Sequence, residues 1–243
     1  MKIRLDQRVV NEGLAESREQ AKRLILAGSI LNPHGEALTK PGIPIDEKIQ
    51  IHLKEPLKYV SRGGLKLEGF MKDLPLSVSD FRCLDIGSST GGFTDYLLQN
   101  GAREVTCVDV GSGILHWKIR NDSRVKVFEK INARTLSPEI VGNSFDLAVM
   151  DVSFISLRLV LPSAIPLIRK EGYLVTLVKP QFEAGREHVA KGGVVKSEEI
   201  QKQCVDQIRF FGIEHGLKAL KEAPCCIKGP AGNQEYFILF QKV

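Results

Sequence analysis

The chain has 243 residues, of which 43% are hydrophobic, so it can bury one large core beside a small additional module. The N-terminus lacks a cationic stretch leading into an apolar region, and no apolar run is long enough to span a bilayer. The longest such run, 157–168, is interrupted by Arg158, Pro162 and Pro166. Five cysteines without a CxxC pair or regular spacing argue against a disulfide framework or a zinc site. We therefore expect a soluble, cytoplasmic protein without a metal centre.

The net charge of +5 is unevenly distributed along the chain. Residues 1–72 carry 13 Lys and Arg against 9 Asp and Glu, whereas the remaining residues carry 21 against 20. A basic small module beside a nearly neutral large one is typical of a protein whose small part binds a polyanion. Four surplus charges are also compatible with an ordinary solvated surface, so charge alone leaves the question open.

Residues 1–57 predict a small α+β module. An apolar stripe of helical period begins at Leu5 and ends near Leu14, and Ser17 opens a second helix that stops at Gly28. Short strands are expected over 29–32 and 48–53, joined by turn-rich segments. On the second helix, Arg18 and Lys22 are four residues apart with Arg23 beside them. This helix can therefore present a cationic stripe to phosphate groups.

Residues 58–61 are predicted to be a linker, and residues 62–243 change to a pattern of alternating strands and helices. The expected strands are 82–86, 105–109, 125–129, 146–151, 173–179, 218–226 and 235–241. The expected helices are 65–73, 92–100, 114–120, 157–169 and 198–215. This order predicts an α/β domain with a doubly wound, mostly parallel sheet of seven strands.

A glycine-rich turn follows the first strand of this sheet. The strand ends near Asp85, and Gly87, Gly91 and Gly92 form a tight loop that opens into a helix, where a ligand can approach the backbone closely. The spacing differs from the G-x-G-x-x-G of dinucleotide binders, and the Lys-Ser/Thr ending of a phosphate-binding loop is missing. A loop that need not cradle phosphates suits S-adenosylmethionine, whose corresponding end is an amino acid.

An acidic residue, Asp109, ends the next strand, where a carboxylate can accept hydrogen bonds from both ribose hydroxyls of an adenosine ligand. Asn132 follows the third strand and is expected to face the adenine. Glycine-rich turns occur in many α/β proteins, so it is the combination of loop and acid that indicates the cofactor. The expected cofactor-binding residues are Asp85, Gly87, Ser88, Ser89, Thr90, Gly91, Gly92, Phe93, Asp109, Val110, Asn132 and Asp151.

Further charged residues are predicted at the same edge of the sheet. Asp151 and Lys179 end two neighbouring strands, and ligands of open α/β sheets bind outside the carboxyl ends of strands. Lys66 lies on the helix that enters the domain, and Glu235 opens the last strand. Singly, each has an ordinary explanation as a solvated residue or a helix cap. Together they predict a cluster beside the cofactor sulfonium.

Five segments carry a resemblance to the TlyA (hemolysin A) family: SRGGLKL (61–67), LDIGSSTGGFT (84–94), DVSFIS (151–156), VKPQFE (178–183) and GPAGN (229–233). The family's catalytic domain is similar to FtsJ-type ribose methyltransferases, and its N-terminal module is similar to the S4 RNA-binding domain. The resemblance covers nearly the whole chain and implies a Rossmann-like class I methyltransferase fold. It also implies that Arg4, Arg18, Lys22, Arg23 and Arg62 contact RNA.

In that family a Lys-Asp-Lys-Glu tetrad acts on the ribose 2′-hydroxyl, and Lys66, Asp151, Lys179 and Glu235 match its members. A ribose hydroxyl is a poor nucleophile, so the protein must orient or deprotonate it. Two neighbouring lysines are expected to lower each other's proton affinity, which makes Lys179 the expected base. Asp151 is then expected to align this ammonium, and Glu235 to place Lys66. The reaction requires no metal.

The resemblance implies S-adenosylmethionine-dependent methylation of ribosomal RNA in ribosomal subunits, on cytidines of the large-subunit RNA and, in some members, of the small-subunit RNA. The sequence does not identify the nucleotide or the oligomeric state. One alternative is a membrane-active hemolysin, which the missing export signal, spanning segment and membrane-binding amphipathic stretch disfavour. A non-catalytic RNA-binding protein is another. A pseudouridine synthase can have a similar N-terminal module, but it would not need the glycine loop.

Overall fold

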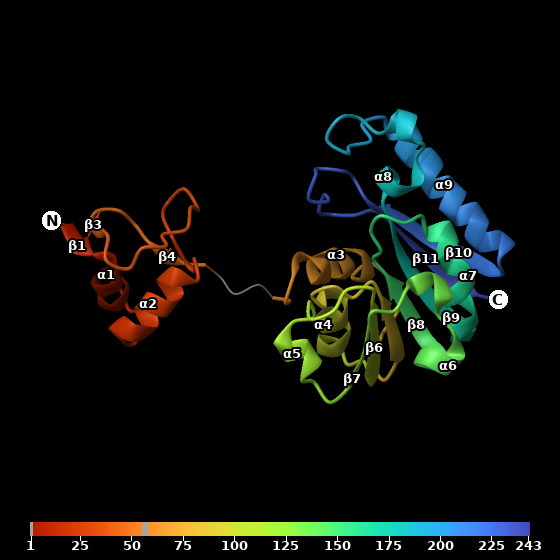
Figure 1. Cartoon of the computed structure of the whole chain (residues 1–243), viewed down its shortest axis with the longest axis horizontal. Coiled ribbons are helices and arrows are strands. Elements are labelled where there is room, and N and C mark those ends of the chain that lie inside the picture. The colour runs from red at the N-terminus through yellow and green to blue at the C-terminus, as the bar shows by residue number, and fades with distance from the viewer. Residues whose placement is uncertain (1, 55–57) are drawn as a thin grey trace. The chain divides into compact units, whose positions relative to one another are not determined.

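The computed structural model describes residues 2–54 and 58–243. The chain divides into two compact units, a smaller unit of residues 1–56 and a larger unit of residues 57–243 (Figure 1). The predicted boundary at residue 57 lies outside the described residues. Each unit has its own hydrophobic core, and each is described by itself.

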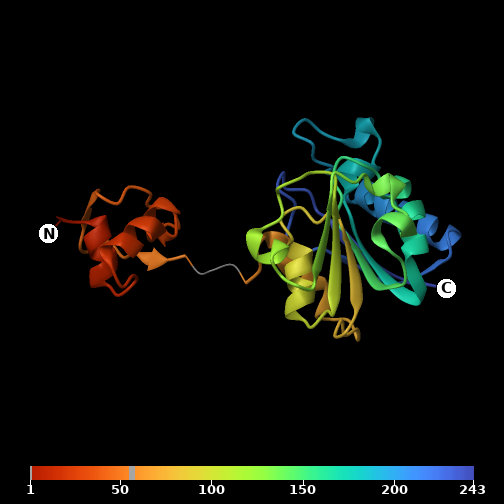
Figure 2. The ribbon, with the colours of Figure 1, turned by 60° about the horizontal axis from the view of Figure 1, so that its bottom comes forward.

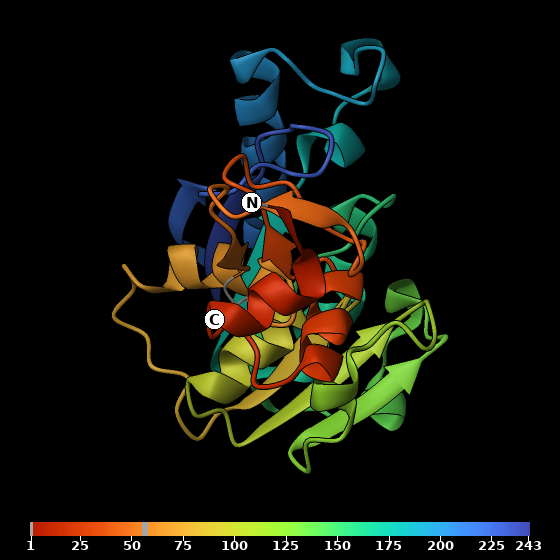
Figure 3. The same ribbon diagram turned by 90° about the vertical axis from the view of Figure 1, so that its left-hand side faces the viewer.

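The smaller unit packs two helices against two short antiparallel strand pairs (Figure 3). Ser17 begins the second helix as predicted, because its side chain accepts the backbone N–H of Gln20. The predicted strands 29–32 and 48–53 are only two residues long in the structure. The first and third strands were not predicted, because three residues are too few to show an alternating hydrophobic pattern. The elements are β1 (Lys2–Arg4), α1 (Leu5–Asn11), α2 (Arg18–Leu26), β2 (Ile30–Leu31), β3 (Pro44–Asp46) and β4 (His52–Leu53).

The larger unit is built on a seven-stranded sheet of order β10-β11-β9-β8-β5-β6-β7. Strands β5 to β9 pair in parallel, whereas β11 pairs antiparallel with both β9 and β10. Both the predicted class and the mostly parallel sheet are confirmed. The strands are β5 (Arg82–Ile86), β6 (Glu104–Asp109), β7 (Val125–Glu129), β8 (Phe145–Met150), β9 (Ile168–Val178), β10 (Leu217–Pro224) and β11 (Tyr236–Lys242).

Helices cover both faces of this sheet, as Figure 2 shows. On one face α3 (Arg62–Met71), α4 (Gly92–Gln99) and α5 (Trp117–Arg120) pack against alternate strand residues such as Cys83 and Leu147. On the other face α7 (Leu161–Ala164) and α9 (Glu198–Glu214) pack against Leu84 and Ala148. Because successive strand residues point to opposite faces and both faces are covered, the central strands are mostly apolar, with Asp85, Thr106 and Thr176 as buried polar exceptions.

Two of the predicted helices differ from the structure, and the difference has a local cause in each. The helix expected over 157–169 is a run of short pieces, η2 (Leu157–Leu159), α7 and η3 (Ile165–Leu167), and β9 already begins at Ile168. Pro162 and Pro166 lie in the first turn of two of these pieces, because proline lacks the N–H that a continuing helix needs. The helix expected over 114–120 is shortened to α5, because His116, with a ψ of 139°, is its N-cap and its side chain accepts the Lys118 N–H.

Two short helices were not predicted, α6 (Pro138–Val141) and α8 (Pro180–Glu183). Each has proline in its first turn, where the fixed φ favours the start of a helix. Among the described residues, no helix combines the length and apolarity that crossing a membrane requires.

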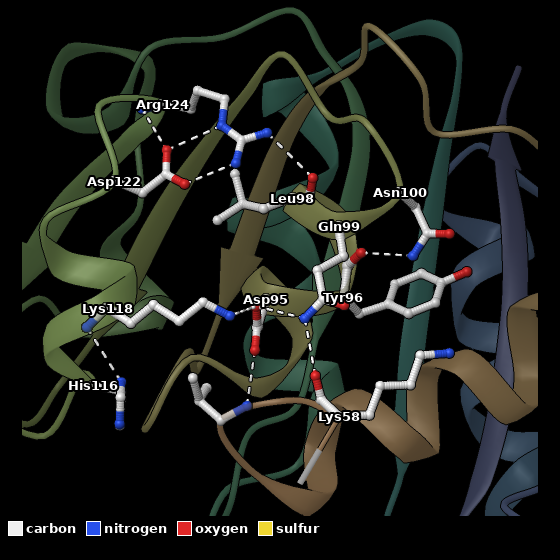
Figure 4. A network of polar contacts seen from close by, with 11 residues as sticks. Lys58, Asp95, Tyr96, Leu98, Gln99, Asn100, His116, Lys118, Asp122 and Arg124 are labelled. Atoms are coloured by element: carbon white, nitrogen blue, oxygen red, sulfur yellow. Dashed lines mark hydrogen bonds and ion pairs between the residues drawn. The ribbon is translucent and has the colours of Figure 1, made fainter. Parts of the chain in front are cut away.

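The segment predicted as a linker, 58–61, packs onto the larger unit. The side chain of Tyr59 is 2% exposed and lies against Gly64 of α3, where a Cβ would overlap its ring. The Val60 N–H donates to Asp95 Oδ2 at 2.8 Å, and Gln99 Nε2 donates to the Lys58 carbonyl at 3.0 Å (Figure 4). These contacts fix the approach to α3 on the surface of α4.

Candidate active site

The glycine turn between β5 and α4 is held between two other parts of the larger unit. Gly87 has a φ of +83°, and a Cβ there would lie 2.5 Å from the Asp151 carbonyl. Gly91 is the N-cap of α4 with a φ of +91°, and a Cβ on Gly92 would overlap Ser61 at the start of α3. Only glycine satisfies these conditions. The turn therefore lies in direct contact with the segment after β8 and with α3.

Asp85 is fully buried under this turn, and its carboxylate is only half satisfied. Oδ2 accepts hydrogen bonds from the Thr94 backbone N–H at 3.1 Å and hydroxyl at 2.6 Å, whereas Oδ1 has no hydrogen-bond partner among the described residues. Burial raises the pKa of Asp85 to about 7, and the charges of Asp151 and Asp109 act in the same direction against the Thr94 hydrogen bonds. A buried, unpaired oxygen on a cavity wall is suited to a cationic donor.

Two cavities lie at the carboxyl edge of the parallel strands. The adenosine cavity, as we name it, has a volume of about 380 Å³ and mostly apolar walls that include Val108, Ile131 and Ile155, with Asp109 and Asn132 as polar residues. The second, which we name the reaction cavity, has a volume of about 250 Å³. It is lined by the glycine turn with Asp85, Lys66, Lys179, Ser61 and Arg62. Both cavities include Gly87, Ser89, Asp151 and Ser153 in their walls, so the two are neighbours.

Asp109 and Asn132 both line the adenosine cavity, as the sequence predicted. The Asp109 carboxylate accepts the backbone N–H groups of Ser89 and Gly111, each at 2.7 Å, and so fixes the glycine turn. Each carboxylate oxygen keeps a further lone pair for a ligand hydroxyl. The Asn132 Oδ1 accepts the Arg134 N–H at 3.0 Å, which leaves its NH₂ group as a donor. Val110 is exposed at the rim.

The four residues of the predicted tetrad form two ion pairs. Lys66 Nζ lies 2.5 Å from Glu235 Oε2, and both side chains are buried. Lys179 Nζ lies 2.6 Å from Asp151 Oδ1. Lys66, Asp151 and Lys179 line the reaction cavity. Each lysine thus contacts the carboxylate that was expected to place it, Glu235 for Lys66 and Asp151 for Lys179.

The topology explains this convergence. Strands β8 and β9 are parallel neighbours, so Asp151 and Lys179, which follow them, emerge at the same edge. Strand β11 runs antiparallel to β9, with Tyr236 opposite Val178, so its start lies beside the end of β9. Glu235 therefore lies directly before β11, which begins one residue later than predicted, and its side chain reaches Lys66 on α3.

The residues predicted to contact RNA fall into two groups. In the smaller unit, Arg4 and Arg18 both contact Oδ2 of one buried carboxylate, that of Asp6, with Nη2 to Oδ2 distances of 3.0 and 2.9 Å. The hydrogen bond from Arg4, aided by Arg18, holds the pKa of Asp6 well below its usual range despite burial. Lys22 and Arg23 are exposed on α2. Arg62 belongs to the larger unit and lines the reaction cavity.

Sequence reasoning missed three residues of these sites. Asp6 was not singled out, although it lies between Arg4 and Arg18 in the structure. Ser153 accepts a hydrogen bond from Lys179 Nζ at 2.8 Å. Phe154, at the rim of the adenosine cavity, is 91% exposed, has a φ of +63°, and its ring lies 5.1 Å from that of Phe182. The last two belong to the DVSFIS segment, which the sequence had marked for Asp151 alone.

A doubly wound sheet of this strand order, with a glycine turn after β5 and an acid after β6, defines the class of Rossmann-like, S-adenosylmethionine-dependent methyltransferases. An FtsJ-like methyltransferase family model matches residues 59–242. The chain therefore belongs to the FtsJ-like methyltransferase family. Its predicted likeness to the TlyA proteins is confirmed by relatives that match over nearly the full chain.

YqxC of Bacillus subtilis, described as a putative rRNA methyltransferase, is 46% identical over 98% of this chain and 85% of its own length. The 16S/23S rRNA (cytidine-2′-O)-methyltransferase TlyA of Mycobacterium tuberculosis is 41% identical over 98% of this chain and 89% of its own. A solved structure described as a putative hemolysin from Streptococcus thermophilus is 43% identical, with a TM-score of 0.76 over 100% of this chain and 89% of that chain.

Proposed function

We propose that this chain transfers a methyl group from S-adenosylmethionine to the 2′-hydroxyl of a ribose in ribosomal RNA. The observation that carries the proposal is the pair of ion pairs, Lys66 with Glu235 and Lys179 with Asp151, at a cavity that adjoins a second cavity of the right character for adenosine. The names of the TlyA relatives, which specify cytidine-2′-O methylation of 16S and 23S rRNA, support cytidine as the target nucleotide.

The residues of the two cavities fit S-adenosylmethionine. Asp109 is placed to accept the ribose hydroxyls of the cofactor, and the apolar walls with the free amide donor of Asn132 suit its adenine. Asp85 Oδ1, buried and unpaired, is suited to the α-amino group, and the glycine turn 87–92 allows close approach. When bound, the cofactor supplies an activated methyl group on a sulfonium.

The tetrad then acts on the ribose hydroxyl. Lys179 orients the hydroxyl and accepts its proton at Nζ, and Asp151 holds this side chain at 2.6 Å. The buried ion pair of Lys66 with Glu235 keeps the second ammonium on the cavity wall, where it holds the oxygen of the hydroxyl by a hydrogen bond. Lys179 must first release one proton to solvent to act as the base. Once it has accepted the hydroxyl proton, the two ammonium groups and the two carboxylates balance in charge.

The remaining groups serve RNA binding in this proposal. The smaller unit acts as an S4-like module whose Arg4, Arg18, Lys22 and Arg23 contact phosphates, and Arg62 contacts phosphate near the reaction cavity. The exposed ring of Phe154 can stack on an unpaired base beside the cavities. The partner is ribosomal RNA within ribosomal subunits.

The proposal is tested by incubating wild-type protein with radiolabelled S-adenosylmethionine and separated ribosomal subunits. We expect label in RNA, and we expect Lys179→Ala to reduce transfer at least about 100-fold while the cofactor dissociation constant changes little. Failure of the wild type to label either subunit or its naked RNA would contradict the proposal. Lysis of liposomes by both proteins would favour the hemolysin alternative instead.

A further inference from the structure

The Nζ atom of Lys179 contacts two side chains of the segment that follows β8. Its distance to Asp151 Oδ1 is 2.6 Å and its distance to Ser153 Oγ is 2.8 Å. The Lys179 side chain is about 10% exposed, so water has little access to this nitrogen. The contact with Ser153 is a hydrogen bond that takes one N–H direction, whereas the contact with Asp151 is an ion pair in which Oδ1 accepts no hydrogen bond from the described residues.

Ser153 occupies a special place because it lines both the adenosine cavity and the reaction cavity. Gly87, Ser89 and Asp151 share this property, but all three have roles in the tetrad or the glycine turn. The junction of the two cavities is where a cofactor methyl group and a ribose hydroxyl must meet. The contact between Ser153 and Lys179 therefore lies at the reacting centre rather than behind it.

The backbone that carries Ser153 is anchored at both ends. The Asp151 N–H donates to the Ile86 carbonyl at 3.0 Å, next to the glycine turn. At the other end, the buried Glu183 carboxylate accepts from Ser156 Oγ at 2.6 Å and from the Leu157 N–H at 2.8 Å. A hydroxyl on a segment fixed in this way can hold a neighbouring group in one orientation.

A neutral lysine nitrogen carries one carbon, two hydrogens and one lone pair in a tetrahedral arrangement. Ser153 accepts one N–H group and the charge of Asp151 attracts the other, which leaves one direction for the lone pair. Without Ser153, the amine could rotate about its Cε–Nζ bond and turn the lone pair away from the substrate. We propose that Ser153 is a positioning residue that aims the Lys179 lone pair at the ribose hydroxyl.

This proposal rests on the proposed function, and its chemistry balances. The ribose O–H bond breaks and its proton forms the third N–H bond of Lys179. The hydroxyl oxygen bonds to the methyl carbon, and the electrons of the broken S–C bond return to sulfur. The ammonium formed on Lys179 keeps its ion pair with Asp151 and its hydrogen bond to Ser153. The other charged groups close to the reaction cavity do not change in this step; they are Asp85, Lys66, Glu235 and Arg62.

The test uses full-length Ser153→Ala, Ser153→Thr and Ser156→Ala proteins. Threonine keeps the hydroxyl, whereas Ser156→Ala disturbs the same segment at its contact with Glu183 and leaves the lysine contact in place. Two readouts are compared: the single-turnover methylation rate against pH with saturating cofactor and RNA, and the lysine-selective ¹⁵N NMR signal of the Lys179 ammonium group.

We expect Ser153→Ala to lower the maximal rate by roughly tenfold, with an unchanged cofactor dissociation constant, because a hydrogen bond to a charged group is lost. The acid limb of its pH profile moves to lower pH, since the ammonium loses an acceptor. The ammonium hydrogens of Lys179, protected from exchange in the wild type, lose this protection. Ser153→Thr restores all three properties, and Ser156→Ala leaves the acid limb and the protection unchanged.

An unchanged acid limb and unchanged exchange protection in Ser153→Ala would overturn the proposal, as would failure of threonine to restore them. The NMR readout needs no RNA. If the wild type methylates no RNA while the Lys179 signal still responds to Ser153→Ala, the proposed function fails and the positioning contact is upheld.

Discussion

At the residue scale, the active site depends on how each buried charge is compensated. Lys66 and Lys179 each contact a carboxylate, whereas Asp85 has only Thr94 as a donor and keeps one free oxygen. A free buried carboxylate oxygen destabilises the protein until a cation reaches it. Asp85 is therefore the group at which cofactor binding and pH are most directly coupled.

Cofactor affinity should rise with pH. The pKa of Asp85 is raised to about 7, above the ordinary value of an aspartate. The free protein therefore loses folding stability as pH rises from about 4 through 7, because Asp85 ionises more readily in the unfolded chain than in the folded one. The ammonium of the cofactor favours the ionised form, so binding releases a proton. Between pH 5 and pH 7 the association constant should increase by up to about tenfold per pH unit.

Calorimetric titration with S-adenosylmethionine across this pH range measures the slope, and buffers of different ionisation enthalpy measure the released proton. Asp85→Asn should bind weakly with a flat pH dependence, whereas Asp122→Asn, a carboxylate paired with Arg124 outside both cavities, should behave as the wild type. The account of Asp85 is wrong if the wild-type affinity is flat with pH and no proton is released.

At the element scale, much of the larger unit follows from local sequence patterns. Apolar runs such as 105–108 and 173–178 indicated inner strands, because strands covered on both faces are mostly apolar. Proline positions were present in the sequence, but their effect on the stretch 157–169 was underestimated. Tyr59 could not be placed from the sequence, since it packs on a bare glycine backbone of α3, a contact that only the folded arrangement creates.

The site was predicted in the same uneven way. Residues at strand ends, such as Asp109, Asp151 and Lys179, follow from topology because parallel strands end at one edge. Ser153 and Asp6 were missed because their significance lies in partners distant in sequence, Lys179 and Arg18. A serine or aspartate in a loop gives no pattern that separates such a contact from an ordinary solvated side chain.

The crossing of α3 and α4 should be sensitive to a single methyl group. Gly92→Ala would place a Cβ against Ser61 Oγ and 2.9 Å from the Gly64 nitrogen, so the helices must move apart. We expect a loss of about 1–3 kcal/mol in the unfolding free energy, as for other overpacked sites. Gly63→Ala is the matched control, because its Cβ makes no contact closer than 3.4 Å. Urea denaturation compares the two, and equal stability would refute the close crossing.

In the smaller unit, Asp6→Asn should weaken RNA binding even though it removes a negative charge. The Asp6 carboxylate holds Arg4 and Arg18 together, and asparagine cannot pair with both guanidinium groups. We expect affinity for ribosomal RNA to fall about tenfold and the salt dependence to decrease by up to roughly two phosphate contacts.

Exposed Glu16→Gln makes the same charge change and should leave affinity unchanged or slightly stronger. Fluorescence anisotropy at several salt concentrations measures both variants. Adding Asp6→Asn to an Arg4→Ala/Arg18→Ala protein should cause no further loss, because the three residues act as one group. Tighter RNA binding by Asp6→Asn would show that its carboxylate is only a repelling charge.

At the scale of the whole molecule, the chain combines a larger unit that contains both cavities with a smaller unit of nearly balanced charge. Residues 1–56 carry 9 Lys and Arg against 8 Asp and Glu, so the expectation of a basic small module is wrong: most of the surplus counted over 1–72 lies in 58–72, at the start of the larger unit. The larger unit has a complete tetrad and both cavities, and the smaller unit has a preformed pair of arginines. The proposed function assigns the chemistry to the larger unit and affinity for RNA to the smaller unit. Substitutions in one should leave the other's ligand binding intact.

The central claim concerns which atom receives the methyl group. Ribosomal subunits treated with the wild-type protein and methyl-deuterated S-adenosylmethionine can be digested to nucleosides and analysed by mass spectrometry. The account predicts that the deuterated methyl group appears on ribose, as 2′-O-methylcytidine, and that Lys179→Ala produces none. A methyl group found on a base, or equal product from Lys179→Ala, would contradict it.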